Sequence, residues 1–117
     1  MKNYRDLIVW QKSMKFVTDI YVVSSQFPST ELYGLISQIR RCAVSIPSNI
    51  AEGYGRNSRK DYSRFISFAI GSLYECQTQI QIALNLNYIK QADFDELFEK
   101  TRELERMLSS LRNKLDN

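Results

Sequence analysis

The chain has 117 residues, 44% of them hydrophobic and 25% charged, with a formal net charge of +3. This length predicts one domain with a single core, and four Gly and two Pro are too few for the many turns of an all-β fold. The absence of His excludes Ser-His-Asp and Cys-His catalysis and removes the commonest zinc ligand.

The first predicted helix spans about residues 6–25. Two apolar rows run along it at steps of three and four residues, a spacing typical of a wide apolar helix face. One row consists of Leu7, Trp10, Met14, Val17 and Tyr21, and the other of Phe16, Ile20, Val23 and Phe27. We interpret this apolar excess as an oligomer interface, with burial of both rows inside the protein as the alternative.

The second predicted helix spans about residues 31–53 and contains Pro47. Its apolar residues keep helical spacing on both sides of the proline: Leu32, Leu35, Ile39, Cys42, Ile46 and Ile50. Because proline removes a backbone donor, we predict one kinked helix, with two short helices as the alternative. A loop from Gly53 to Ser58 follows, and Ser58 is a favourable N-cap residue for the next helix.

The third and fourth predicted helices span about residues 58–86 and 91–115. In the third, Gly71 and Ser72 indicate a close approach by another helix, or a kink, and two sets recur every seven positions: Ile66, Leu73 and Ile80, and Ala69, Cys76 and Ala83. In the fourth, alternating steps of three and four are typical of a bundle seam, made by Phe94, Leu97, Thr101, Leu104, Leu108, Leu111 and Leu115.

Four amphipathic helices with short loops predict an all-α, antiparallel up-down-up-down four-helix bundle formed by residues 1–117 as a single domain. In a hairpin of the second and third helices, facing residues have numbers that sum to about 117. Cys42 and Cys76 are therefore expected at the same level, close enough to touch. In a reducing compartment we expect two small buried hydrophobic residues, with a disulfide as the less favoured alternative.

Residues 40–53 (RRCAVSIPSNIAEG) resemble the signature of bacterial four-helix-bundle proteins encoded in intervening sequences of 23S ribosomal RNA genes. Leu7-x-x-Trp10, Phe27-Pro28 and Gly71-Ser72-Leu73 are similar too, whereas Cys42 and Cys76 stand where the family more often has Ala and Leu. The resemblance implies a ring-like homopentamer and no settled biochemical activity. A related family, the accessory protein of diversity-generating retroelements, works with RNA and a reverse transcriptase.

Positive charge is concentrated in residues 40–64, which hold six basic residues against two acidic ones. Our nucleic-acid-binding candidates lie at the start of the third helix and in the loop before it: Tyr54, Arg56, Arg59, Lys60 and Arg64. A phosphate there would meet backbone N–H groups, the positive helix end and several cations, while Tyr54 could stack on an unpaired base. The alternative is a solvated loop whose charges serve solubility.

A second group of residues is a candidate structural polar network around Pro47, fixing the register of the helices: Arg40, Arg41, Asn49, Glu52 and Glu75. By the hairpin numbering, Arg40 and Arg41 are the nearest partners for the Glu75 carboxylate, which needs one if it lies near the core. A ligand-binding or subunit-contact role is the alternative.

We therefore expect a non-catalytic homo-oligomer, a pentamer by the resemblance, that binds structured RNA or DNA through the start of the third helix. The alternative is a protein–protein interaction scaffold ring without nucleic acid, and a small-molecule enzyme is the least favoured class. We expect no metal, cofactor or small-molecule substrate. No apolar run approaches the ~20 residues of a membrane span, and no signal-peptide core is present, so a cytoplasmic location without membrane contact is expected.

Overall fold

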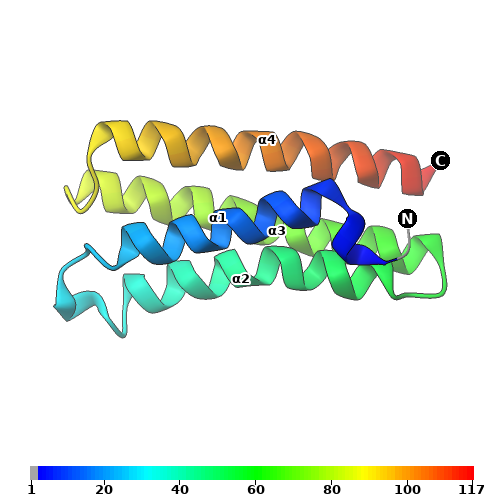
Figure 1. Cartoon of the computed structure of the whole chain (residues 1–117), viewed down its shortest axis with the longest axis horizontal. Helices are drawn as coiled ribbons and strands as arrows, with labels where there is room; N and C mark the ends of the chain where they lie inside the picture. Colours follow the sequence, from blue (N-terminus) through cyan, green and yellow to red (C-terminus); the bar gives the residue numbers. More distant parts are fainter. Residues whose placement is uncertain (1–2) are drawn as a thin grey trace.

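The computed structural model describes residues 3–117. Within that range the chain forms only helices: α1 (Ile8–Ser24), α2 (Leu35–Tyr54), α3 (Arg59–Asn85) and α4 (Gln91–Asp116), with short 3-10 turns η1 (Tyr4–Asp6) and η2 (Ser29–Glu31). Successive helices run in opposite directions along a body of 43 × 24 × 21 Å (Figure 1). The predicted all-α fold with four helices is confirmed.

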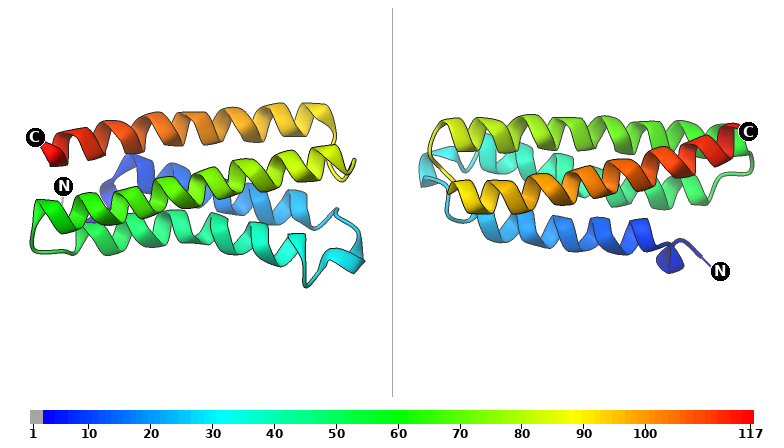
Figure 2. Two further views of the ribbon diagram at one scale, coloured as in Figure 1. Left: turned by 180° about the vertical axis from the view of Figure 1, so that it is seen from behind. Right: turned by 90° about the horizontal axis from the view of Figure 1, so that it is seen from above.

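Each helix packs on the next along the chain, and α4 returns to contact α1, so the four helices enclose one core (Figure 2). The η1 turn, the end of α4 and the α2–α3 loop lie at one end of the bundle (Figure 1). The α1–α2 and α3–α4 connections lie at the other end. None of the helices formed by residues 3–117 combines the length and apolar character needed to cross a membrane.

Only one of the two apolar rows of α1 is fully buried. Phe16 and Ile20 lie in the core, whereas in the other row Trp10 and Val17 are partly buried against the core and Met14 and Tyr21 are 42% and 43% exposed. The bundle therefore does not bury both rows itself, which was the alternative to an oligomer interface. The helical face of α4 follows the predicted seam, with Leu97, Thr101, Leu104 and Leu108 buried.

The α2 helix is continuous through Pro47, so the alternative of two short helices is wrong. The predicted start near residue 31 is also wrong, because Ser29–Glu31 forms a separate 3-10 turn and Leu32 is 49% exposed. From that turn the Glu31 carboxylate accepts a hydrogen bond from the Leu35 N–H at 3.2 Å. This contact satisfies a free donor at the helix start, which is why α2 begins four residues later.

The close approach between α2 and α3 is at Gly53 rather than at Gly71. A Cβ atom at Gly53 would lie 2.8 Å from the Cβ of Phe65, whereas one at Gly71 would meet nothing within 4 Å. The interpretation of Gly71 as a contact position is therefore wrong. Its neighbour Ser72 does contact α2, through a hydrogen bond of 2.8 Å between its Oγ and that of Ser45.

Candidate nucleic-acid interface

The predicted nucleic-acid-binding residues gather at the end of the bundle where α2 ends and α3 begins (Figure 1). Ser58 is the N-cap of α3, and its hydroxyl accepts a hydrogen bond from the Asp61 N–H at 3.1 Å. The expected cap is therefore confirmed. It positions the first turns of α3 so that Lys60 and Arg64 both face solvent.

Two arginines of this region lie on phenylalanine rings. The Arg56 guanidinium is 4.5 Å from the ring centre of Phe65, and that of Arg64 is 5.4 Å from Phe65 and 5.7 Å from Phe68. The two rings contact each other edge to face at 5.5 Å. Because cation–π contacts hold the planar guanidinium groups against the rings, the cations are kept at the surface in a defined place. We call Arg56, Lys60, Arg64, Phe65 and Phe68 the basic corner.

Only weak ion pairs with acidic side chains would compete with a phosphate for the cations of the basic corner. Arg56 lies 3.9 Å from Glu52 and Arg64 lies 3.7 Å from Asp61, and the two arginine side chains are 45% and 59% exposed. Ion pairs this exposed contribute about 0–1 kcal/mol. Among residues 3–117, Lys60 is exposed and has no acidic partner within ion-pair distance. Binding of the three cations to an anionic ligand would therefore lose little ion-pair free energy within the protein.

Arg59 belongs to a different part of the structure. Its guanidinium donates hydrogen bonds to the Lys114 carbonyl and, at 3.3 Å, to the Leu115 carbonyl, which are among the last carbonyls of α4. A cation at this position satisfies free acceptors and complements the negative helix end. The Ser63 hydroxyl reinforces the junction by donating to the Asp116 carboxylate. Arg59 thus links α3 to α4 through hydrogen bonds to carbonyl groups, whereas Arg56 and Arg64 make only exposed ion pairs with Glu52 and Asp61.

Tyr54 is also engaged within the protein. Its half-buried ring meets the ring of Tyr62 edge to face at 6.0 Å, and burial, together with the neighbouring Tyr54, raises the pKa of the Tyr62 hydroxyl. The exposed aromatic surface beside the cations is instead Phe68, which is 48% exposed. Phe65 and Phe68 were not among the predicted site residues. The available signal for Phe68 was its position four residues after Arg64, outside the seven-residue repeats of α3.

The polar network near Pro47 exists in a smaller form than predicted. The Asn49 amide donates to the Ser45 carbonyl at 2.8 Å and to the Ser45 hydroxyl at 2.9 Å. The Ser45 hydroxyl in turn bonds the hydroxyl of Ser72 on α3 at 2.8 Å. This chain of hydrogen bonds joins α2 to α3 within one helical turn of Pro47. The role predicted for Asn49 in fixing the register of the two helices therefore has a structural basis.

The other four predicted members do not join that network. Arg40 turns to α1, where it donates to the Ser24 hydroxyl at 2.9 Å and lies 4.6 Å from the Tyr21 ring centre. Glu52 pairs with Arg56. Arg41 and Glu75 line an open groove between α2 and α3, but no ion pair joins Glu75 to either arginine within the described residues. Hairpin numbering gives the level of a residue along a helix and not its direction around the helix axis.

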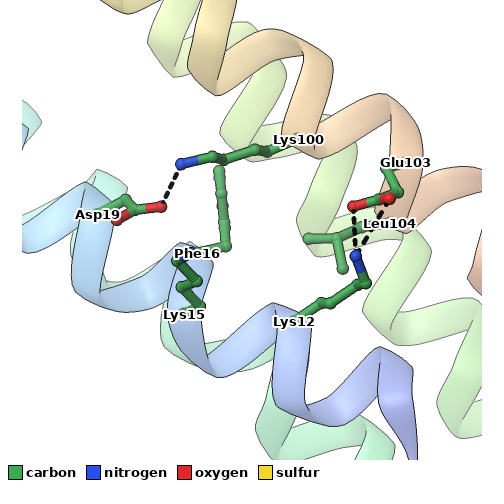
Figure 3. Close-up of a pocket in the computed structure, with 7 residues that line it drawn as sticks. All are labelled: Lys12, Lys15, Phe16, Asp19, Lys100, Glu103 and Leu104. Carbon is green, nitrogen blue, oxygen red and sulfur yellow. Dashed lines mark hydrogen bonds and ion pairs between the residues drawn. The ribbon is translucent and has the colours of Figure 1, made fainter.

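The junction of α1 and α4 contains a small hollow of about 170 Å³ above Phe16 and Leu104 (Figure 3). Ion pairs cross it on either side: Lys12 with Glu103 at 3.2 Å, and Lys100 with Asp19 at 2.7 Å. The hydrogen bond to Asp19 raises the pKa of Lys100. These charges have partners across the junction, so they are neutralised within the bundle and are not free to bind a ligand in this hollow. Nowhere in residues 3–117 do three Cys, Asp or Glu side chains gather as a metal site would require.

A shallow apolar groove of about 310 Å³ lies between η1, α1 and α2. Side chains from the less buried row of α1 form one wall and α2 contributes the other. The residues that line it are Tyr4, Trp10, Met14, Val17, Val44, Pro47, Ser48 and Ala51. The groove therefore gathers part of the apolar surface that the bundle leaves outside, while other exposed apolar side chains, such as Tyr33 and Tyr74, lie elsewhere.

Comparison with known proteins agrees with the resemblance found in α2. Residues 5–110 match the family described as 23S rRNA-intervening sequence protein. The crystal structure of a protein of unknown function from the S23 ribosomal protein family of Bacteroides thetaiotaomicron is similar in fold, with a TM-score of 0.84 at 22% sequence identity over 90% of this chain and 98% of that one. No curated protein matches significantly. The match over nearly the whole length shows that this chain belongs to the 23S rRNA-intervening sequence protein family.

Proposed function

We propose that this chain is a non-catalytic helical protein that binds structured RNA or DNA through the basic corner. The observation that carries the proposal is the alternation of Arg56, Phe65, Arg64 and Phe68 over the start of α3. Guanidinium groups placed over aromatic rings can bind phosphates through paired N–H donors. An exposed ring beside them offers a stacking surface for an unpaired base.

Structured RNA is the first ligand to test. The family description refers to an intervening sequence of 23S rRNA, and structured RNA displays both phosphates and unpaired loop bases. Lys60 supplies a third exposed cation beside the two stacked arginines. Binding through a few phosphates is expected to be weak for one copy and strongly dependent on salt.

We propose further that the chain assembles into a ring-like homo-oligomer, with a pentamer as the size that the resemblance implies. Support comes from the apolar groove between α1 and α2, which is lined by Trp10, Met14 and Val17 of the α1 row that the bundle buries only in part. Repetition of the basic corner around a ring would increase the affinity for a long RNA through multivalency. Sedimentation of the purified protein tests this, because Val44→Lys should reduce the oligomer to smaller species if the groove is the interface.

The binding proposal is tested by fluorescence anisotropy of a labelled hairpin RNA over a salt series. The variant is Arg56→Glu/Lys60→Glu/Arg64→Glu, which leaves Arg59 and its junction with α4 intact. We expect affinity to fall by at least about tenfold near 100 mM salt and the salt slope to decrease by roughly 2, as for the loss of two or three phosphate contacts.

The matched control is Lys15→Glu/Lys90→Glu/Arg102→Glu, which changes the net charge equally. These three cations are exposed, lie away from the basic corner and have no ion pair among the described residues. The control should bind RNA more weakly than the original protein but clearly better than the basic-corner variant. Equal binding by the two variants, or no salt-dependent binding by the original protein, would contradict the proposal.

The second candidate is a protein–protein scaffold ring without nucleic acid. It is favoured by the apolar groove, because a contiguous apolar surface is typical of a protein interaction site. This candidate expects assembly and partner capture that are insensitive to salt and to charge reversal at the basic corner. An original protein that assembles but binds no RNA, and that loses its assembly in Val44→Lys, would favour this candidate over the first.

A further inference from the structure

The two cysteines of the chain meet in the core of the α2–α3 hairpin. The Sγ atoms of Cys42 and Cys76 lie 2.8 Å apart, and both residues are free thiols. The Cys42 thiol is also 3.2 Å from the side-chain oxygen of Gln79. Two thiols in direct contact across helices need only small side-chain movements to reach the S–S bonding distance of about 2.0 Å.

The two thiols differ in their access to solvent. Cys42 is 5% exposed and lies on the wall of the open groove between α2 and α3, whereas Cys76 is fully buried behind it. The groove has a volume of about 430 Å³ and is lined at this level by Ser45, Ser72, Glu75 and Gln79. Its polar walls admit a small polar oxidant to the Cys42 sulfur, while the helices shield Cys76.

We propose that Cys42 and Cys76 form a peroxide-reactive dithiol that closes into a disulfide between α2 and α3. In the first step Cys42 gives its proton to solvent, its thiolate attacks one oxygen of hydrogen peroxide, and the O–O bond breaks. Cys42 sulfenic acid and hydroxide form, and the hydroxide takes up a proton from solvent as the first water. In the second step the Cys76 sulfur attacks the Cys42 sulfur, losing its proton and displacing hydroxide, which leaves as water. Overall, two thiols and one peroxide give one disulfide and two waters.

The order of the steps follows from the environments of the thiols. The hydrogen bond to Cys42, followed by burial, raises the pKa of the Cys76 thiol, so Cys76 keeps its proton in the resting protein. The reactive form of cysteine is the thiolate. Cys42, which faces the groove, is therefore the residue that meets the peroxide, and Cys76 reacts only after Cys42 has become electrophilic.

The disulfide would close the hairpin whose tip carries the basic corner. The closed loop would contain all of the α2–α3 turn, from residue 42 to residue 76. Such a link restricts the unfolded chain and stabilises the folded one. The inference does not depend on nucleic-acid binding, since it rests only on the contact and unequal access of the two thiols.

The test treats the folded protein with hydrogen peroxide, blocks the remaining thiols by alkylation under denaturing conditions, and digests the product with trypsin. We expect an intact mass lower by two hydrogen atoms and a linked pair of peptides, residues 42–56 joined to residues 65–90. Dithiothreitol should restore two alkylatable thiols. Oxidation should raise the melting temperature by roughly 10 °C, as expected for a loop of this size.

Single variants test the order of the steps. Cys76→Ala should accumulate sulfenic acid at Cys42, trapped by dimedone, whereas Cys42→Ala should leave Cys76 unmodified under the same treatment. Circular dichroism checks that both variants stay helical. If peroxide leaves both thiols of the original protein free, or joins only separate chains, the proposal is wrong. If Cys76 in Cys42→Ala reacts as fast as Cys42 in Cys76→Ala, the assigned roles are wrong.

Discussion

The α2–α3 hairpin and the α1–α4 junction hold the bundle together by different means. Between α2 and α3, small residues let the helices approach closely, and Gly53 leaves no room for a side chain against Phe65. Between α1 and α4, long side chains bridge a hollow through the ion pairs of Lys12 and Lys100. Close packing tolerates little change in volume, whereas exposed ion pairs contribute little to stability. The basic corner therefore lies on the more closely packed of the two helix pairs.

The largest effect should come from adding a single methyl group in the hairpin. Gly53→Ala places a Cβ 2.8 Å from the Cβ of Phe65, too close to the backbone of α3 for a side-chain rotation to relieve. We expect a loss of about 2 kcal/mol of unfolding free energy, measured by urea denaturation. Gly55→Ala is the matched control, because its Cβ would lie 3.6 Å from the Glu52 carbonyl, an ordinary contact. Equal stability of the two variants would refute the close packing at Gly53.

A smaller loss is expected when the polar link between α2 and α3 is cut. Ser45→Ala removes the hydroxyl that bonds both Asn49 and Ser72, leaving partly buried polar groups without that partner. The expected cost is about 1–2 kcal/mol of unfolding free energy. Ser48→Ala provides the comparison, since its exposed hydroxyl bonds only the Val44 carbonyl of its own helix. Equal melting temperatures of the two variants would show that the Ser45–Ser72 link does not contribute to stability.

A substitution at Arg59 tests the contact between the α2–α3 hairpin and the end of α4. Arg59→Ala removes the donors to the last carbonyls of α4, and we expect a loss of about 1 kcal/mol. Hydrogen exchange should show faster opening of the last turn of α4 than in Lys60→Ala, which changes an exposed neighbour. RNA binding should decrease no more in Arg59→Ala than in Lys60→Ala. A larger decrease would mean that Arg59 itself contacts the phosphate.

The smallest effect is expected at the α1–α4 junction. Lys100→Gln removes the ion pair with Asp19, and because both side chains are partly exposed the loss should be about 0.5 kcal/mol. The folded-state pKa of Lys100 is raised by Asp19. Its stabilising contribution is therefore complete below the unfolded lysine pKa of about 10.4 and disappears as the pH rises through the higher folded value. Denaturation at neutral and strongly alkaline pH should show the two proteins converging at high pH.

Several features of the fold could be predicted because they depend on local periodicity. The repeats Ile66–Leu73–Ile80 and Ala69–Cys76–Ala83 are all buried in α3, and the contact of Cys42 with Cys76 follows from the length of the hairpin. The start of α2 was predicted wrongly because the Leu32 spacing continues the helical pattern, while the Glu31 side chain forms the cap instead. Spacing alone carries no information on which polar group will satisfy the first N–H donors.

The candidate site was predictable in its place but not in its composition. Clustered charge located the cations at the start of α3, yet it could not distinguish Arg59, which binds α4, from Arg56 and Arg64, which lie on phenylalanines. It also assigned the stacking role to Tyr54, whose ring packs against Tyr62. Tyr54 and Arg59 have their partners on other helices, and Arg56 reaches Phe65 from the loop before α3. These distances depend on how the helices are rotated about their axes, whereas the contact of Arg64 with Phe68 lies within α3.

The amino-acid sequence by itself determined the helical class, the four segments, the level at which α2 and α3 residues face one another, and the family. Each of these follows from apolar spacing or from a motif within one segment. The tertiary structure alone decided which arginine binds the end of α4 and which lie on phenylalanine rings, which row of α1 is only partly buried, and which cysteine faces the groove. Those outcomes depend on the direction of each side chain around its helix axis, which is set by packing against the neighbouring helices.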